Sequence, residues 1–294
     1  MGFTPTLARV TAAGERPPPR LMLISDHRVF YFGLLGTPGQ RNFGCATLYV
    51  AERGPLTFDL GHGWQSGSLA WVPLYTPHRI RSRDRQLAVI MLEPEYTDTK
   101  AAGRHFNQRR RSAPIALRES LLEGVRRLRN LPADIQLEDE AFDALLFGRR
   151  LPADDLDPRI GRVVDHLCLR GDDGRSAACL ARDEGLSQSR FLHLFKEQTG
   201  VCLRKYRAWR RARSLLYHVR SEATLTDIAM ETGYPDSTHF SHSIRRIYGL
   251  PPRDIVSGSR RLRIQIQVSQ CSASVCRPLV ATPHKSLSRA TAMV

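Results

Sequence analysis

The stretch that decides the fold of this chain is AACLARDEGLSQSRFLHLFK, residues 177–196. A short helix is predicted to end at Gly185, because glycine readily adopts the left-handed backbone of a tight turn. Ser187 follows at an N-cap position, where its hydroxyl can accept a backbone amide of the next helix. The stretch therefore predicts two short helices joined by a glycine turn, which is the helix-turn-helix layout.

The same layout is repeated in LTDIAMETGYPDSTHFSHSIRRIYG, residues 225–249. We expect a helix that starts at Leu225 or Thr226 and ends at Gly233, with Asp236 capping the helix that follows. A single unit of this kind is explained equally well by two solvated helices around an ordinary turn. Two units with matched layout favour a shared function.

A helical wheel separates two faces on the second helix of each unit, since successive residues advance by about 100°. Phe191, Leu194 and Phe195 form the buried stripe of the first, and Phe240, Ile244 and Ile247 form that of the second. The outward faces carry small polar and basic side chains: Ser189, His193 and Lys196 flanked by Gln188 and Leu192, and Thr238, His242 and Arg245 flanked by Ser241 and Arg246. Side chains of these types can reach base edges and phosphates in the major groove of DNA.

A long helix is predicted between the two units, from Leu203 to Val219. Its roughly 17 residues span about 25 Å. Such a strut can hold two recognition helices about one DNA turn apart, near 34 Å, on one side of a duplex. One subunit is then expected to read two adjacent segments of the major groove of double-stranded DNA.

The N-terminal half has the pattern of an all-β domain. Short segments rich in β-branched and aromatic residues are separated by Gly, Pro and Asn, which favours a β barrel or sandwich. These segments are Val29–Leu35, Phe43–Ala51, Leu56–Leu60, Leu69–Val72 and Leu87–Leu92. The basic stretch Arg104–Pro114 is predicted to be a loop. Residues 115–130 and 137–149 have helical periodicity, and these two helices either cover the β core or pair with a second copy in a homodimer.

The chain is therefore predicted to be an α+β protein. The expected organisation is a flexible N-terminus (1–20), a β-rich domain with two helices (21–149), a linker (150–155), an all-α domain with two helix-turn-helix units (156–257) and a basic tail (258–294). The tail contains six basic residues and no acidic residue, and we expect it to be mostly disordered. A strand at Ile264–Val268 is possible, but no neighbouring strand is predicted for it.

Composition agrees with a nucleic-acid partner and with a location in the cytoplasm. The formal net charge of +15 favours an acidic partner. No apolar run approaches the roughly 20 residues of a membrane helix, and residues 1–20 lack a secretory pattern. None of the six cysteines forms a CxxC pair, so reduced and buried thiols are expected.

The C-terminal 100 residues or so resemble the DNA-binding domain of the AraC/XylS transcription regulators. The resemblance is carried by motifs in both units, in the right order and spacing: Leu180-Ala181, Gly185-Leu186-Ser187, FLHLFKEQTG at 191–200, Asp227-Ile228-Ala229, Gly233-Tyr234, His239-Phe240-Ser241 and RRIYGLPP at 245–252. It implies bacterial transcription control, often activation, with RNA polymerase as a partner and a small molecule as effector.

Carried over by position, the resemblance assigns two classes of DNA contact. The base-reading residues would be Gln188, Ser189, Leu192, His193, Ser237, Thr238 and His242. The phosphate contacts would be Lys196, Ser241, Arg245 and Arg246. Ile244 stands where the family often has an aromatic residue, a core substitution that should not affect DNA binding.

The N-terminal half resembles a divergent cupin-type sensor domain of the same family. The second cupin motif is partly visible as Gly67, Pro73 and Thr76-Pro77-His78, and Tyr75 stands where a glycine is usual. The first motif is missing, since His27 and His62 stand alone, whereas a metal site needs three or four convergent ligands. We therefore predict no metal, no cofactor and no enzyme activity, with His78 a packed or hydrogen-bonded residue.

Three functions remain open from the sequence. The first is a transcription regulator whose N-terminal domain senses a ligand or dimerises. The second is a metal-dependent cupin enzyme with an appended helical domain, against which the missing histidine cluster argues. The third is a regulator without an effector, which the weak cupin pattern keeps open.

Overall fold

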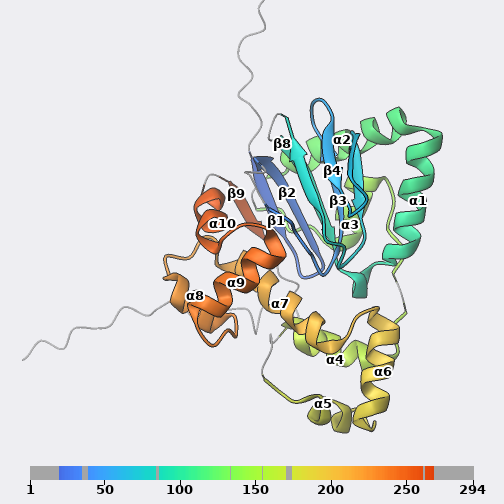
Figure 1. Ribbon diagram of the computed structural model, residues 1–294. Helices are drawn as coiled ribbons and strands as arrows, with labels where there is room; N and C mark the ends of the chain where they lie inside the picture. Colours follow the sequence, from blue (N-terminus) through green and yellow to red (C-terminus); the bar gives the residue numbers. More distant parts are fainter. Residues whose placement is uncertain are drawn as a thin grey trace, which may run out of the picture.

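The computed structural model describes residues 20–34, 39–83, 86–132, 134–153, 155–169, 174–260 and 262–267. A β-rich N-terminal half is followed by a helical half, which confirms the predicted α+β class (Figure 1). None of the described helices is long and apolar enough to span a bilayer. The structural account below concerns these ranges.

The strands form two sheets of unequal size. The larger sheet has the order β6-β3-β8-β2-β1-β9 and the smaller sheet the order β5-β4-β7. The strands are β1 (Leu21–Ile24), β2 (Arg28–Leu34), β3 (Ala46–Ala51), β4 (Leu56–Asp59), β5 (Trp64–Gly67), β6 (Leu69–Val72), β7 (Arg79–Ser82), β8 (Gln86–Leu92) and β9 (Arg263–Ile266). β1, β5 and β7 were not among the predicted segments, and the sequences of β5 and β7, WQSG and RIRS, are polar and largely exposed.

One face of the larger sheet is covered by three helices, α1 (Thr99–Ser112), α2 (Pro114–Arg129) and α3 (Asp139–Phe147). Strand side chains alternate between faces, so Leu21 and Leu23 of β1 pack under these helices while Met22 and Ile24 point the other way. The apolar stripe of α2, including Leu121, is thus used to cover the β core. Of the two roles left open for these helices, the structure shows this one.

The prediction of a loop at Arg104–Pro114 is wrong. Residues up to Ser112 belong to α1, whose N-cap Asp98 accepts the amide of Ala101. Ala102 and Phe106 lie four residues apart and are buried against the sheet, and Phe106 stacks on Trp71. The arginine run dominates the composition of this segment, whereas its buried residues have the spacing of a helix.

The helical half contains α4 (Pro158–Leu169), α5 (Ala177–Asp183), α6 (Gln188–Thr199), α7 (Leu203–His218), α8 (Leu225–Glu231), α9 (Ser237–Tyr248) and α10 (Pro252–Ser259). The long helix α7 belongs to two cores. Its N-terminal part, with Tyr206, packs with α4, α5 and α6, while Trp209, Leu215 and Leu216 belong to the core that includes α8 and α9.

The second helix-turn-helix unit shares its core with the β domain. The core that contains Phe240 and Ile244 also contains Met22 and Val89 of the larger sheet and Phe58 of the smaller one. Trp209 approaches so closely that a Cβ on Gly44 would lie 2.3 Å from its ring. The two cores therefore cut across the predicted division at 150–155, because the first unit has a core of its own whereas the second is fused to the sheet.

A buried ionic cluster joins α7 to the segment after β8. Glu93 lies 2.6 Å from Nε of Arg213, as an ion-pair contact without good hydrogen-bond alignment, and accepts Trp209 Nε1–H at 2.8 Å. Tyr206 donates to Glu95 at 2.7 Å, and the Arg213 guanidinium also donates to the carbonyl of Ser25. Burial, and then the neighbouring Glu93, raise the pKa of Glu95.

The predicted start of the disordered tail, at residue 258, is too early in the chain. Residues up to Ser259 continue the fold as α10, and β9 pairs with β1 in parallel, with Ile264 opposite Met22. The possible strand at Ile264–Val268 thus has a neighbour more than 200 residues away in the sequence. Residues 1–19 and 268–294, on which the other predictions of flexibility fall, lie outside the described residues.

Candidate nucleic-acid interface

The first helix-turn-helix unit forms by the local signals that its sequence carries. α5 starts at the N-cap Ser176, and Gly185 takes a left-handed backbone with φ of 66°. The hydroxyl of Ser187 accepts the amide of Arg190 and starts α6. Phe191 and Phe195 are fully buried on the inner face, as predicted.

The second unit repeats this geometry with stronger caps. Thr224 and Asp227 form a capping box at the start of α8, and Gly233 has φ of 79°. Asp236 caps α9 by accepting the amides of Thr238 and His239. These bonds fix the angle at which α9 leaves the turn.

Sequence reasoning missed a brace on the second turn. Arg211 of α7 donates to the carbonyl of Gly233 at 3.3 Å, and its guanidinium lies 5.4 Å from the ring centre of Tyr234. Tyr234 in turn donates to Ser243 on α9 at 3.0 Å. No local sequence signal links Arg211 to a turn 22 residues further on, so only the fold reveals this contact.

All eleven predicted DNA-contacting residues are accessible on α6 and α9. Eight are exposed: Gln188, Ser189, His193, Lys196, Thr238, His242, Arg245 and Arg246. Three are half-buried: Leu192, Ser237 and Ser241. The two helices therefore each present one continuous polar and basic face, and the contacts that this face makes with DNA stay a prediction.

His78 is a packed histidine with both ring nitrogens engaged. Its side chain is 2% exposed, Nε2 lies 2.7 Å from the Tyr49 hydroxyl, and Nδ1 lies 2.8 Å from the carbonyl oxygen of Thr76. Burial lowers its pKa to about 4. The prediction of a hydrogen-bonded His78 is confirmed, and among the described residues no group of three His, Cys, Asp or Glu side chains converges as metal ligands.

The low pKa of His78 makes stability depend on pH. The unfolded chain binds the proton near pH 6.5 and the folded one only near pH 4, so acid favours unfolding. The contribution of neutral His78 to the free energy of unfolding is fully present above about pH 6.5. About 3 kcal/mol of that free energy should be lost as the pH falls to about 4. Urea unfolding at several pH values checks this. His78→Gln should show a shallower loss over the same interval, and parallel curves would contradict the assignment.

A cavity of about 470 Å³ lies where the second unit meets the β domain. Its sheet side includes Val89 and Met91, and its helical side includes Leu216 and Ile255. The lining is mainly apolar, and Arg41 lies among it with a buried Nε that has no hydrogen-bond partner among the described residues. A small molecule in this cavity would touch both parts of the protein.

The C-terminal part of the chain is similar to known sequences. Residues 180–257 match the family described as a helix-turn-helix domain. The chain is 31% identical over 94 residues to the invasion protein InvF of Salmonella typhi, covering 32% of this chain and 44% of that protein. It is 48% identical over 66 residues to the HTH-type transcriptional activator RhaS of Escherichia coli O139:H28, covering 21% and 23%. The match thus spans less than half of each relative.

Solved structures show more distant likenesses. ToxT from Vibrio cholerae is 11% identical with a TM-score of 0.49, covering 80% of this chain and 98% of that one. A transcriptional regulator of Chromobacterium violaceum, described by its AraC-type DNA-binding domain, is 21% identical with a TM-score of 0.33, covering 35% and 92%.

Proposed function

We propose that this protein is a transcription regulator of the AraC/XylS type, which binds promoter DNA through α6 and α9 together. Support comes from the match of residues 180–257 to a helix-turn-helix family and from the likeness to the activator RhaS. In this proposal Gln188, Ser189, Leu192, His193, Ser237, Thr238 and His242 read bases. Lys196, Ser241, Arg245 and Arg246 hold phosphates. The bound regulator activates transcription by contact with RNA polymerase, a step that rests on the family alone.

The observation that carries the proposal is the pair of accessible polar faces on α6 and α9. Both helices are fixed to α7, whose 16 residues span about 24 Å. That length suits two recognition helices entering successive turns of one major groove. Charge supports the same reading, since Lys196, Arg245 and Arg246 add cations beside the base-reading positions.

The direct test is selection of binding sites from a pool of random duplex DNA by the full-length protein, at two salt concentrations. We expect an enriched motif with two blocks about one helical turn, near 34 Å, apart. Binding at low salt without any enriched sequence would reduce the function to non-specific attraction by a basic protein. A motif with a single block would leave only one of the two units as a reader.

We further propose that a small-molecule effector binds in the 470 Å³ cavity between the sheet and the second unit. The volume suits a small ligand. Arg41 donates to the Tyr49 hydroxyl through one terminal nitrogen, but its buried Nε has no partner among the described residues. The apolar lining and this N–H suit a molecule with an apolar body and one acceptor group. The cavity is lined by Met91 on the sheet and by Ile255 on α10, which follows α9. A bound ligand would therefore change how strongly the second unit is attached to the sheet.

A cavity-filling variant tests the effector site. Ile255→Trp places a large ring at the half-buried edge of the cavity, while α6 and α9 keep their outer faces. A screen of small organic acids and aromatic compounds by thermal shift should give ligands that stabilise the natural protein, since ligands that bind only the folded state raise its stability. The variant should lose these shifts and keep DNA binding.

Two other outcomes of that screen are informative. If no compound shifts the melting temperature and DNA binding is unaffected, the protein is a regulator without an effector. If shifts persist unchanged in Ile255→Trp, the effector site lies elsewhere. The alternative of a metal-dependent enzyme is not favoured, since the described residues contain no cluster of three metal-ligating side chains and the relative RhaS is a transcriptional activator.

A homodimer through 115–149 stays a prediction. Most of the apolar stripe of α2 is buried against the sheet, but Ile115 at its start is 72% exposed. Analytical ultracentrifugation of the natural protein and of Ile115→Lys decides it, since a dimer formed there should dissociate in the variant.

A further inference from the structure

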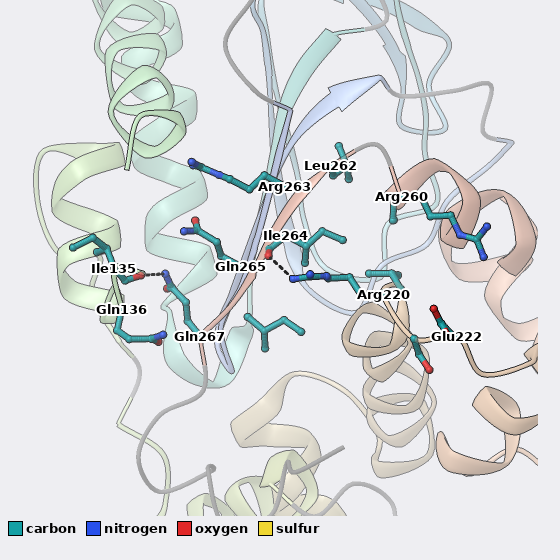
Figure 2. A pocket seen from close by; sticks show the side chains of 14 residues that line it. Ile135, Gln136, Arg220, Glu222, Arg260, Leu262, Arg263, Ile264, Gln265 and Gln267 are labelled. Carbon is teal, nitrogen blue, oxygen red and sulfur yellow. Dashed lines mark hydrogen bonds between the residues drawn. The ribbon is translucent and has the colours of Figure 1, made fainter. Parts of the chain in front are cut away.

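The last described strand, β9, has an open edge. It ends the six-stranded sheet, with β1 on one side and no further strand among the described residues on the other. Residues 262–267 line a cavity of about 850 Å³, and Figure 2 shows side chains that line it. Open edges offer unpaired backbone groups to an added strand, so natural proteins usually blunt or cover them.

Alternate backbone groups of β9 form hydrogen bonds with β1. The amides of Arg263 and Gln267 donate to the carbonyl oxygens of Arg20 and Ile24 in or beside β1, at 2.9 and 2.7 Å. Because bonding direction alternates along a strand, the amide and carbonyl groups of Ile264 and Ile266 face the open side. Arg220 reaches the carbonyl oxygen of Ile264 at 3.5 Å, a marginal hydrogen bond (Figure 2).

Two walls turn this edge into a groove. On one side, the side chains of Gln265 and Gln267 donate to the carbonyl oxygens of Pro132 and Ile135, at 2.9 and 3.2 Å, and hold the loop between α2 and α3. On the other side stands the turn between α7 and α8, which contributes residues 220–222. Hydrogen bonds within the protein therefore fix the position of the first wall.

The charges around the groove select its occupant. Arg220 and Arg260 line it as exposed cations, and Glu222 is the one acidic residue among the described residues that line it. Arg263 also lines it, but its half-buried guanidinium donates to the carbonyl oxygen of Arg129 at 3.0 Å. A second copy of β9 would bring two sets of arginines together, and like charges across paired strands are unfavourable. Residues 268–294 are no better suited, since they contain basic residues and no Asp or Glu.

We propose that β9 is a docking edge for an extended acidic segment of another protein, which adds to the larger sheet as a further strand. Main-chain hydrogen bonds to Ile264 and Ile266 supply the attachment, and the arginines select for acidic side chains. This interaction is separate from DNA binding by α6 and α9, and it does not depend on that function.

Anisotropy with the full-length protein tests the proposal. The probe is a short fluorescein-labelled peptide in which glutamate alternates with valine. A second peptide of equal charge carries proline in place of its central valines and cannot pair as a strand. We expect the first peptide to bind saturably and the second about tenfold more weakly or not at all. Equal binding of the two peptides, or no binding of either, would overturn the proposal.

Two variants locate the peptide. Ile266→Pro removes an amide from the open side of β9 while the bonds to β1 use the residues on either side of it, so the strand is retained. Arg220→Glu reverses an exposed charge in the groove. Each should weaken the alternating peptide about tenfold. The matched control Arg253→Glu, an exposed position on α10 outside the groove, should leave it unchanged.

Folding and the competing partner are checked in the same series. Circular dichroism and thermal melting must show that Ile266→Pro is folded. If Ile266→Pro is unfolded, Arg220→Glu still tests whether the peptide binds in the groove. If random duplex DNA displaces the peptide, and Arg220→Glu weakens that DNA as strongly as the peptide, the groove is a nucleic-acid surface and the proposal is wrong.

Discussion

Replacing Arg213 by methionine is expected to destabilise the protein by about 3–5 kcal/mol, because it leaves a carboxylate buried without its counter-charge. Arg213 and Glu93 are each about 1% exposed, and their Nε and Oε1 atoms are 2.6 Å apart. Without the guanidinium, the bond from Trp209 is the one hydrogen bond to the Glu93 side chain among the described residues. Arg210, the next buried cation, pairs with Glu95 at 3.6 Å. Urea unfolding followed by tryptophan fluorescence measures the loss, and Trp209 reports directly on this contact.

The paired variant separates charge from packing. Arg213→Met combined with Glu93→Gln removes both charges and keeps an acceptor for Trp209, so it should recover at least half of the lost stability. A loss below about 1 kcal/mol in Arg213→Met would mean that the pair is hydrated or dispensable. Since the second unit shares a core with the sheet, Arg213→Met should also loosen α9, which limited proteolysis detects.

The double variant Thr238→Glu with His242→Glu is expected to weaken binding to the selected DNA site at least 100-fold. Each of these positions lies on the outer face of α9, and a good base contact is worth about 1–3 kcal/mol. Two added carboxylates also repel the phosphates. Titration of the labelled site by gel shift or anisotropy gives the ratio.

A control of equal charge makes this result specific. Ser66→Glu with Ser120→Glu adds the same two charges at exposed positions on β5 and α2 in the N-terminal half. It should change affinity less than about threefold at moderate salt, since distant surface charges are screened. If the two double variants lose affinity alike, α9 does not enter the groove. If only half of the selected motif loses its sequence preference in Thr238→Glu with His242→Glu, that half is the one α9 reads.

Local signals were sufficient for the two helix-turn-helix units. Gly185 and Gly233 at the turns, Ser187 and Asp236 as caps, and the buried stripe around Phe240 all act within one or two helical turns. A pattern of this range is written into consecutive residues, so α5, α6, α8 and α9 were predicted close to their observed bounds. Strands β2, β3, β4, β6 and β8 followed for the same reason, since strand patterns are also local, whereas the apolar strand β1 was not among the predicted segments.

Tertiary contacts decided what no local pattern holds. α1 is helical because Phe106 and Ala102 are buried against a sheet, although its arginines indicate a loop. β9 exists because β1 offers it a partner, and a parallel pairing between segments so far apart leaves no trace in either sequence. Glu93 is a residue type that is usually exposed, and only the fold shows that it is buried in contact with Trp209 and Arg213.

The amino-acid sequence by itself determined the two helix-turn-helix units, their exposed faces and the fold class, because those depend on helix and strand periodicity and on capping. Only the tertiary structure decided that the second unit shares a core with the β domain, that a cavity lies between them and that β9 carries an open edge. Each of these depends on which surfaces bury apolar area together, a choice made among distant segments and governed by shape and desolvation.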